Sequence, residues 1–348
     1  MVSSKLTLAS LASILPSALA GFDGSSQSNV AVYWGQNSYG QASSQQRLAE
    51  YCSNDEINII PIAFLNGIKT PITNFANAGD NCTAYAGTQL LNCPQLEEDI
   101  KTCQSLGKTI LLSIGGATYT EGGFSDSSSA ESAAQSVWDL FGSDTSQPNR
   151  PFLSAVVDGF DFDFESTTQN FVPFASKLRS LMDADSSKTY YLSAAPQCPY
   201  PDAAMNDMLN GAISFDFIMI QFYNNYCGVS SFTQGSTTQN NFNFQTWDDW
   251  AKNTSANKDV KVFLGVPANT GAGGGYEPAS TLDPIIQFSK QYSSFGGVMM
   301  WDMSQLYQNS GFLDSVYASL TGSGAAKAKA RAPTTLVTKT RAAPTPVV

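Results

Sequence analysis

Short runs of apolar, β-branched and aromatic residues recur along the chain, with longer polar intervals between them. Runs of this length and composition are typical of strands that are buried in a parallel sheet. The intervals 94–106 and 171–182 carry apolar residues at helical spacing, and in the first of them one face holds Leu96, Ile100, Cys103 and Leu106. The eight apolar runs lie at 29–34, 57–65, 109–114, 155–165, 190–195, 217–223, 260–266 and 297–301.

Eight buried strands that alternate with helices predict an α/β fold of the (β/α)8 TIM barrel type. Each helical interval is long enough to return the chain for the next parallel strand. A doubly wound open sheet is the structural alternative, but eight strands spread over 21–322 fit a closed barrel better. We therefore expect one catalytic domain at 21–322, with its site at the carboxyl ends of the strands.

The two ends of the chain differ from this domain in composition. Residues 1–20 combine one lysine, an apolar stretch and a small-residue ending, which is typical of a secretory signal peptide cleaved before Gly21. No apolar stretch is long enough to span a bilayer, so we expect a secreted, extracellular protein. Residues 323–348 are rich in Ala, Thr, Pro and basic residues, which predicts a disordered basic tail. The tail is either an inert extension or a linker, a glycosylated stalk or a tether to an anionic cell wall.

The chain contains no histidine. This excludes catalytic triads that need an imidazole base and zinc sites with histidine ligands. Acid–base chemistry must then fall to carboxylates, tyrosines or lysines. The net charge of -11 disfavours nucleic acid as a partner, although surface carboxylates that keep a secreted protein soluble explain this charge equally well.

Six cysteines, none in a Cys-x-x-Cys pair, favour disulfides over metal thiolates in an exported chain. Sequence reasoning alone leaves their pairing open. Asn81 and Asn253 begin sequons for N-glycosylation, and the first sequon has a cysteine in its middle position. We therefore expect a disulfide-bonded glycoprotein.

The densest chemical signal is the segment DGFDFDFE at 158–165. Because alternate residues of a strand share a face, Asp161, Asp163 and Glu165 point one way and the intervening phenylalanines point the other. The phenylalanines require burial, which disfavours a solvated run of charge. Three carboxyls on a buried face cannot all ionise comfortably, so at least one should keep its proton near neutral pH. A protonated carboxyl beside an ionised one is what cleavage of a glycosidic bond requires.

Metal and phosphate sites fit the sequence less well. A calcium site is the more specific alternative interpretation of the acidic segment. However, a calcium loop needs a glycine turn, whereas this segment is a stiff aromatic strand. The segment Gly107-Lys108-Thr109 lacks the earlier glycine of a P-loop, and the glycine cluster 271–275 opens no evident helix. Both segments are interpreted as turns, and we expect neither a metal nor a cofactor.

The segment DGFDFDFE resembles the DxxDxDxE signature of glycoside hydrolase family 18 chitinases. Its surroundings resemble the fungal and plant class III, hevamine-like branch, and the similarity covers 29–320. It extends to six further segments at the first, second, third, fifth, sixth and eighth predicted strands, namely AVYWGQN, AFLNG, LLSIGG, SAAPQCP, IQFYNN and MMWDMS. The resemblance implies a retaining endochitinase that hydrolyses β-1,4-linked N-acetylglucosamine polymers through an oxazolinium intermediate, with the substrate's own acetamide as nucleophile.

The resemblance also implies a role for each residue. Glu165 would protonate the glycosidic oxygen and later activate water, and Asp163 would orient the acetamido group and stabilise the oxazolinium. Asp161 would share a proton with Asp163, and Asp158 would support the motif structurally. Tyr223 would donate a hydrogen bond to the acetamido oxygen. The remaining sugar contacts would be Tyr33, Gln36, Phe64, Asn66, Gly116, Ala195, Gln221 and Asn224, with Trp301 as the floor of the subsite where the sugar distorts.

The same resemblance implies three disulfides and a substrate. The substrates would be chitin and chitooligosaccharides, and we expect the protein to act as a monomer. The implied disulfides are Cys52–Cys103, Cys82–Cys93 and Cys198–Cys227.

Two other functions use the same fold. A chitinase-like lectin binds sugar without catalysis, but such proteins typically have lost the terminal glutamate or the residues that position the acetamide. This chain keeps Glu165, Asp163 and Tyr223. An endo-β-N-acetylglucosaminidase shares the acidic signature, and the hevamine-like flanking segments argue against it.

Overall fold

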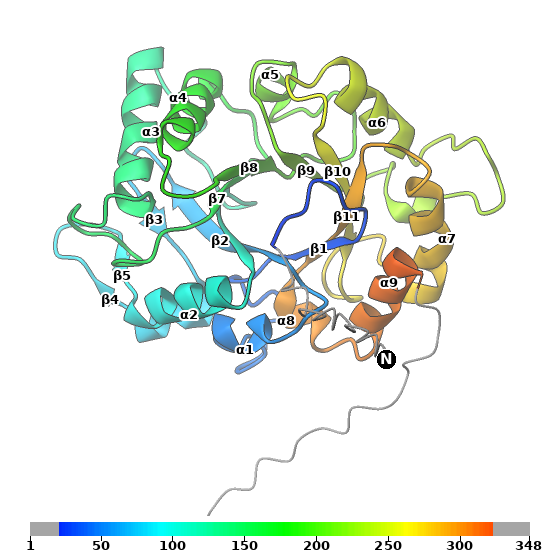
Figure 1. The fold of residues 1–348 in the computed structure, drawn as a ribbon, viewed down its shortest axis with the longest axis horizontal. Helices are drawn as coiled ribbons and strands as arrows, with labels where there is room; N and C mark the ends of the chain where they lie inside the picture. The colour runs from blue at the N-terminus through cyan, green and yellow to red at the C-terminus, as the bar shows by residue number, and fades with distance from the viewer. Residues whose placement is uncertain (1–20, 323–348) are drawn as a thin grey trace, which may run out of the picture.

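The computed structural model describes residues 21–322, in which eight parallel strands form a barrel with helices around it (Figure 1). Neighbouring strands follow the order β1, β11, β10, β9, β8, β7, β6, β2, and β1 pairs with β2 to close the ring. The (β/α)8 TIM barrel predicted from the sequence is therefore confirmed. The predicted signal peptide at 1–20 and the predicted tail at 323–348 lie outside the described residues.

Each predicted strand is present, with ends that differ by a few residues. The largest difference concerns 155–165, of which only 159–163 forms a strand. The carbonyls of Ala155 and Val156 accept hydrogen bonds from the side chains of Arg150, Gln104 and Lys188 instead of joining the ladder. The barrel strands are β1 Asn29–Val32, β2 Ile59–Gly67, β6 Thr109–Gly115, β7 Gly159–Asp163, β8 Tyr191–Ala194, β9 Phe217–Gln221, β10 Lys261–Pro267 and β11 Phe295–Trp301.

Both predicted helices are confirmed as α2 and α4. The prediction that Leu106 belongs to the apolar face of this helix is wrong, because Leu106 lies beyond the end of α2 and exposes 47% of its surface. The chain turns away there through Gly107, which has a φ of +78°. The helices are α1 Leu48–Cys52, α2 Pro94–Ser105, α3 Ser127–Phe141, α4 Phe171–Ala184, α5 Asn206–Leu209, α6 Phe244–Asn253, α7 Ala279–Ser289, α8 Met303–Leu306 and α9 Phe312–Thr321. Short strands β3 Ile72–Thr73, β4 Thr83–Ala84 and β5 Leu91–Asn92 decorate the barrel.

Strand β7 has the two faces that its sequence predicts. Phe160, Phe162 and Phe164 are buried in the layer between the barrel and its helices, where Phe162 contacts Phe174 of α4. Asp161 and Asp163 point to the opposite side and are also buried. The interpretation of this segment as a solvated charge run is therefore excluded.

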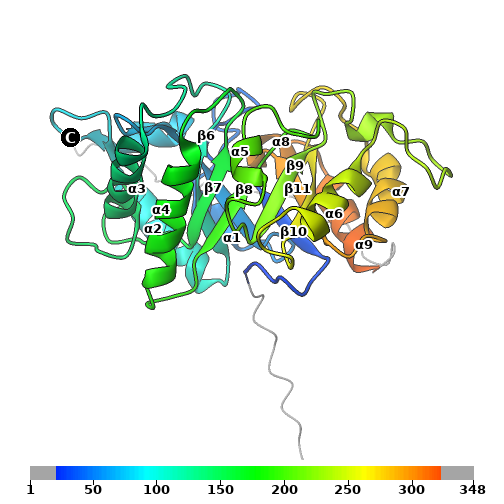
Figure 2. The same ribbon diagram turned by 90° about the horizontal axis from the view of Figure 1, so that it is seen from above.

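The first described residues close the lower end of the barrel. In Figure 2 this dark blue segment passes beneath the strands, before β1 begins. The ring of Phe22 lies 4.4 Å from that of Phe217 and 5.2 Å from that of Tyr191, between centroids. The N–H of Phe22 also donates to the hydroxyl of Thr109 at 2.8 Å. The segment therefore seals the apolar barrel interior at the end away from the carboxyl ends of the strands.

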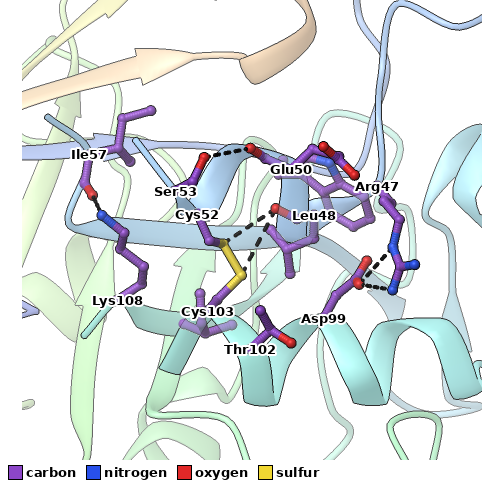
Figure 3. Close-up of a disulfide and its surroundings, with 12 residues drawn as sticks. Arg47, Leu48, Glu50, Cys52, Ser53, Ile57, Asp99, Thr102, Cys103 and Lys108 are labelled. Carbon is purple, nitrogen blue, oxygen red and sulfur yellow. Dashed lines mark hydrogen bonds and ion pairs between the residues drawn. A yellow bond between two sulfur atoms is a disulfide. The ribbon is translucent and has the colours of Figure 1, made fainter. Parts of the chain in front are cut away.

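All three disulfides implied by the resemblance are present: Cys52–Cys103, Cys82–Cys93 and Cys198–Cys227. Figure 3 shows the first of them, which joins α1 to α2 beside the ion pair of Arg47 with the buried Asp99. Disulfides of this kind are typical of proteins that fold in an oxidising compartment. Asn81 and Asn253, the two sequon asparagines, are both exposed. Within 21–322, no helix is long and apolar enough to cross a membrane.

Candidate active site

A cavity of about 200 Å³ lies at the carboxyl ends of the barrel strands, where sites of TIM barrel enzymes are found. Its lining includes most of the site residues predicted from the sequence, namely Tyr33, Gln36, Phe64, Asp163, Glu165, Ala195, Gln221, Tyr223, Asn224 and Trp301. Sequence reasoning missed the remaining lining residues, which are Ala117, Thr118, Ala272 and Met299. These four carry small or apolar side chains, so no chemical signal in the sequence distinguishes them.

Glu165 and Asp163 meet at a single amide group. Nε2 of Gln221, the last residue of β9, lies 2.9 Å from Oδ1 of Asp163 and 3.3 Å from Oε1 of Glu165. The same nitrogen lies 3.0 Å from the carbonyl oxygen of Ala195, which fixes the amide in the barrel. Asp163 is buried, whereas Glu165 follows β7 and is partly exposed. Gln221 therefore holds the two carboxyl groups side by side, with Glu165 nearer to solvent.

The surroundings of these two carboxyls disfavour their joint ionisation. Burial raises the pKa of Asp163 well above its usual range, and the charges of Glu165 and Asp161 raise it further. Burial also raises the pKa of Glu165, and the charge of Asp202 adds to this effect, while the hydrogen bond from Gln221 opposes it. Because ionisation of one carboxyl hinders that of the other, the pair keeps a proton at a pH where isolated carboxyls have lost theirs.

Asp161 lies deeper in the barrel and accepts three hydrogen bonds from hydroxyl groups. Tyr33 and Ser113 donate to Oδ2 at 2.7 Å and 2.6 Å, and Ser193 donates to Oδ1 at 2.7 Å. Burial raises the pKa of Asp161, and all three hydroxyls lower it. No hydrogen bond joins Asp161 to Asp163 in the described part of the chain, so the proton sharing implied by the resemblance has no direct contact in this arrangement.

Tyr223 lines the same cavity as Asp163 and Glu165. Burial and the charges of Asp163 and Glu165 hold the pKa of its phenol well above the ordinary value, so the hydroxyl stays protonated and can donate a hydrogen bond. A phenol donor close to two carboxyls suits a ligand that brings its own acceptor oxygen.

The next residue, Asn224, is held by the glycine-rich loop 271–275. The N–H of Asn224 donates to the carbonyl of Gly274 at 2.8 Å, and the N–H of Gly274 donates to Oδ1 of Asn224 at 2.6 Å. A Cβ atom at Gly273 would lie 3.4 Å from the Tyr223 ring and 3.2 Å from Oδ1 of Asn224. This loop, which the sequence alone indicated only as a turn, therefore packs its backbone against Tyr223 and Asn224.

Three further aromatic rings line the cavity. The rings of Phe64 and Trp301 are stacked with centroids 5.9 Å apart, and Tyr33 lies 5.4 Å from Trp301. Gly116 does not line the cavity, because it lies under Phe64: a Cβ atom there would come within 2.7 Å of the ring. Asn66 also lies outside the lining, and its Nδ2 contacts the hydroxyl of Thr118 at 3.4 Å. Both residues shape the cavity through a neighbour, and their role as sugar contacts stays a prediction.

Asp158, the first acidic residue of the segment, lies away from the cavity. Its carboxylate pairs with Lys188 at 2.6 Å and accepts the N–H of Ile110 at 2.8 Å and an amide N–H of Gln104 at 3.0 Å. These contacts tie β6 to the start of β7. Within 21–322, no group of three or more cysteine or acidic side chains is arranged to hold a metal ion.

Comparison with known proteins gives consistent matches. The model of glycosyl hydrolases family 18 matches residues 29–274. Endochitinase 33 of Trichoderma harzianum is 57% identical, over 90% of this chain and 98% of that protein. A class III chitinase of Arthroderma benhamiae is 49% identical, over 91% of this chain and 92% of that protein. Among solved structures, a chitinase from Ipomoea carnea matches with a TM-score of 0.67 at 28% identity, over 84% of this chain and 99% of that one.

The family match begins at β1 and ends in the glycine-rich loop after β10. It contains the whole acidic segment, Gln221 at the end of β9 and Tyr223 two residues later, whereas the cavity residues Met299 and Trp301 lie beyond it. The chain therefore belongs to glycosyl hydrolases family 18 and is a glycoside hydrolase.

Proposed function

We propose that this protein is an endochitinase that hydrolyses β-1,4-linked N-acetylglucosamine polymers with retention of anomeric configuration. The observation that carries the proposal is the amide of Gln221 in contact with both Asp163 and Glu165, with the Tyr223 phenol in the same cavity. The names of the relatives support chitin as the substrate, since those proteins are described as an endochitinase and a class III chitinase.

In the first step, Glu165 is protonated and donates its proton to the glycosidic oxygen. The bond from that oxygen to the anomeric carbon breaks, and the acetamide oxygen of the same sugar bonds to the anomeric carbon, giving an oxazolinium ion. Asp163 accepts a hydrogen bond from the acetamide N–H and stabilises the positive charge. Tyr223 donates to the acetamide oxygen and orients it for attack.

In the second step, the Glu165 carboxylate removes a proton from water, and the water oxygen attacks the anomeric carbon from the side that the leaving group vacated. The bond to the acetamide oxygen breaks, and Glu165 regains its proton. Two inversions give net retention. The raised pKa of Glu165 suits this exchange, because the same carboxyl must donate a proton in one step and accept one in the next.

The stacked pair of Phe64 and Trp301 supplies the surface on which the reacting sugar rests. The apolar face of a pyranose ring packs well on an aromatic ring, which suits Trp301 as the floor of the central subsite. We also propose that the protein is exported through residues 1–20, acts as a monomer and carries glycans at Asn81 and Asn253. The three disulfides and the exposure of both asparagines support export and glycosylation.

The variant Glu165→Gln tests the assignment of the acid. It should lower kcat on colloidal chitin by more than about 100-fold, since one residue serves as both acid and base, while the affinity for chitooligosaccharides is kept. Glu131→Gln, an exposed glutamate of α3, is the matched control and should keep full activity. Full activity of Glu165→Gln would exclude Glu165 as the acid.

Stereochemistry tests the second part of the proposal. Proton NMR of the first products should show the β anomer ahead of mutarotation. An α anomer as first product would exclude retention, whatever the substrate. Sugar binding by the wild-type protein without any hydrolysis would indicate a lectin.

A further inference from the structure

Exposed tyrosines of this protein are confined to one end of the barrel. In the part of the chain that the structure describes, the exposed large apolar residues are Tyr39, Tyr200, Tyr226, Tyr307 and Leu106. Each of the four tyrosines lies in the connection that follows a barrel strand, after β1, β8, β9 and β11 respectively. These connections emerge at the end of the barrel that holds the cavity, whereas Leu106 lies after the last turn of α2.

Two of these tyrosines have a packing role. The ring of Tyr200 contacts that of Trp247 edge-on at 5.2 Å, and the ring of Tyr307 contacts that of Tyr51 at 4.6 Å. Tyr39 and Tyr226 expose 38% and 64% of their surfaces, and neither ring contacts another aromatic ring within 21–322. Contacts with other aromatic rings of the described domain therefore do not account for the rings at these two positions.

Both rings lie close to the cavity along the chain. Tyr39 is three residues beyond Gln36 and Tyr226 is three residues beyond Tyr223, and both of those residues line the cavity. An extended residue spans at most about 3.6 Å, so each tyrosine Cα lies within about 11 Å of the Cα of a lining residue. In the barrel ring, β1 and β9 are separated by β10 and β11 on one side and by four strands on the other. The two tyrosines thus belong to connections on different sides of the barrel ring.

The backbone at both positions is held firmly. The N–H of Tyr39 donates to the hydroxyl of Ser304 at 3.1 Å, next to a bond from Ser38 to Asp302 at the same distance. The carbonyl of Tyr226 accepts from Ser231 at 2.6 Å, and the following residue forms the disulfide Cys198–Cys227. A ring on an anchored backbone loses little conformational freedom when a ligand packs against it, which favours binding.

We propose that Tyr39 and Tyr226 are outer sugar-binding residues, each stacking on a pyranose ring of a chain that extends beyond the central cavity. The inference rests on the proposed function, since it takes the ligand to be a β-1,4-linked N-acetylglucosamine chain. Two tyrosines on different sides of the barrel select for polymer over short fragments, because only a long chain reaches both. This selection is what an endo-acting enzyme requires of its binding energy.

Chain-length dependence tests the proposal. Tyr39→Ala and Tyr226→Ala should each raise KM for chitohexaose roughly 2- to 10-fold, the effect expected from one lost aromatic contact. Both should leave kcat/KM unchanged for the methylumbelliferyl glycoside of N,N′-diacetylchitobiose, which is too short to reach the rings. Tyr226→Phe keeps the ring and should keep the wild-type KM. Leu106→Ala, which removes an exposed apolar side chain far from the cavity, is the control and should change neither value.

An unchanged KM for chitohexaose in the variant that carries both Tyr39→Ala and Tyr226→Ala would overturn the proposal. An equal loss of kcat/KM on the long and the short substrate would overturn it too. Affinity of chitohexaose for the Glu165→Gln protein, measured by calorimetry with and without the two tyrosine substitutions, gives a readout that needs no turnover. A lower affinity in the protein with the two tyrosine substitutions supports the outer contacts. This result holds even if the wild-type protein proves inactive, because inactivity would overturn only the proposed function. Equal affinities would reject the outer contacts alone.

Discussion

Asp161 is the residue whose replacement should have the largest effect on stability at this site. Its carboxylate is fully buried and is the acceptor for the hydroxyls of Tyr33, Ser113 and Ser193. Asp161→Ala removes that acceptor for all three groups at once. A buried hydroxyl left without a partner costs about 1–3 kcal/mol, so the variant should lose about 3–9 kcal/mol of the free energy of unfolding. This is comparable to the total stability of a typical domain, about 5–15 kcal/mol.

Asp161→Asn should behave differently, although it removes the same charge. The amide oxygen can replace Oδ2 and accept from Tyr33 and Ser113, and the amide nitrogen can donate to Ser193 once that hydroxyl rotates. Replacing the carboxylate also relieves the burial of a charge, which is what raises the pKa of Asp161. We therefore expect a loss of only about 1–2 kcal/mol, because three charged hydrogen bonds become neutral ones.

The assay is urea unfolding followed by tryptophan fluorescence, with disulfides intact and with m values compared to exclude a change in the unfolded state. The diagnostic quantity is the difference between the two variants, since both lack the negative charge. If the alanine and asparagine variants were equally stable, the three hydroxyls would not depend on an acceptor at this position. The role assigned here to Asp161 would then be wrong.

Three further predictions concern other parts of the molecule. Burial and a neighbouring carboxyl raise the pKa of Glu56 to about 7. Since a raised folded-state pKa stabilises the protein only while the group is protonated, wild-type stability should fall as the pH rises through about 7. Glu56→Gln should lack that fall when urea unfolding is compared at about pH 5 and about pH 8. Gly273→Val should displace Tyr223 and lower kcat on short and long substrates alike, while Gly273→Ala stays near wild type in the same kinetic assay, because its single methyl group needs a shift of only a few tenths of an ångström. Phe22→Ala should lower the free energy of unfolding by about 2–3 kcal/mol without changing KM, because it opens the sealed end of the barrel. In the same unfolding assay Leu106→Ala should stay within about 0.5 kcal/mol of wild type.

The fold and the acidic face of β7 were predictable because both follow from local periodicity. Alternation of Asp and Phe assigns each side chain of 160–164 to one face, whatever the strand pairs with. The (β/α)8 barrel follows from the repetition of short apolar runs and helical intervals. The fold then places the predicted site residues at the carboxyl ends of the strands, and most of them line the cavity there.

The hydrogen bonds that alter the pKa values of the carboxyls were not predictable, because they depend on the register between neighbouring strands. In the barrel, Asp161 pairs laterally with Ser113 of β6 and Ser193 of β8, and this register brings both hydroxyls to its carboxylate. A shift of one residue would turn these serines to the opposite face. Periodicity within one strand contains no information about such a shift. The same reason explains why the bridge from Gln221 and the glycine-rich loop against Asn224 emerge only from the structure.

The carboxyls of Asp161, Asp163 and Glu165 differ chiefly in how deeply they are buried, and this difference gives them different chemical roles. Asp161, the deepest, has three hydroxyl donors that favour its charged form against the effect of burial. Its charge raises the pKa of Asp163, which is also buried and accepts a hydrogen bond from the amide of Gln221. Glu165 is partly exposed and can exchange its proton with water or with a ligand in the cavity. Burial and mutual repulsion thus keep a proton on the pair of Asp163 and Glu165, and Glu165 is the member of that pair from which a bound sugar can take it.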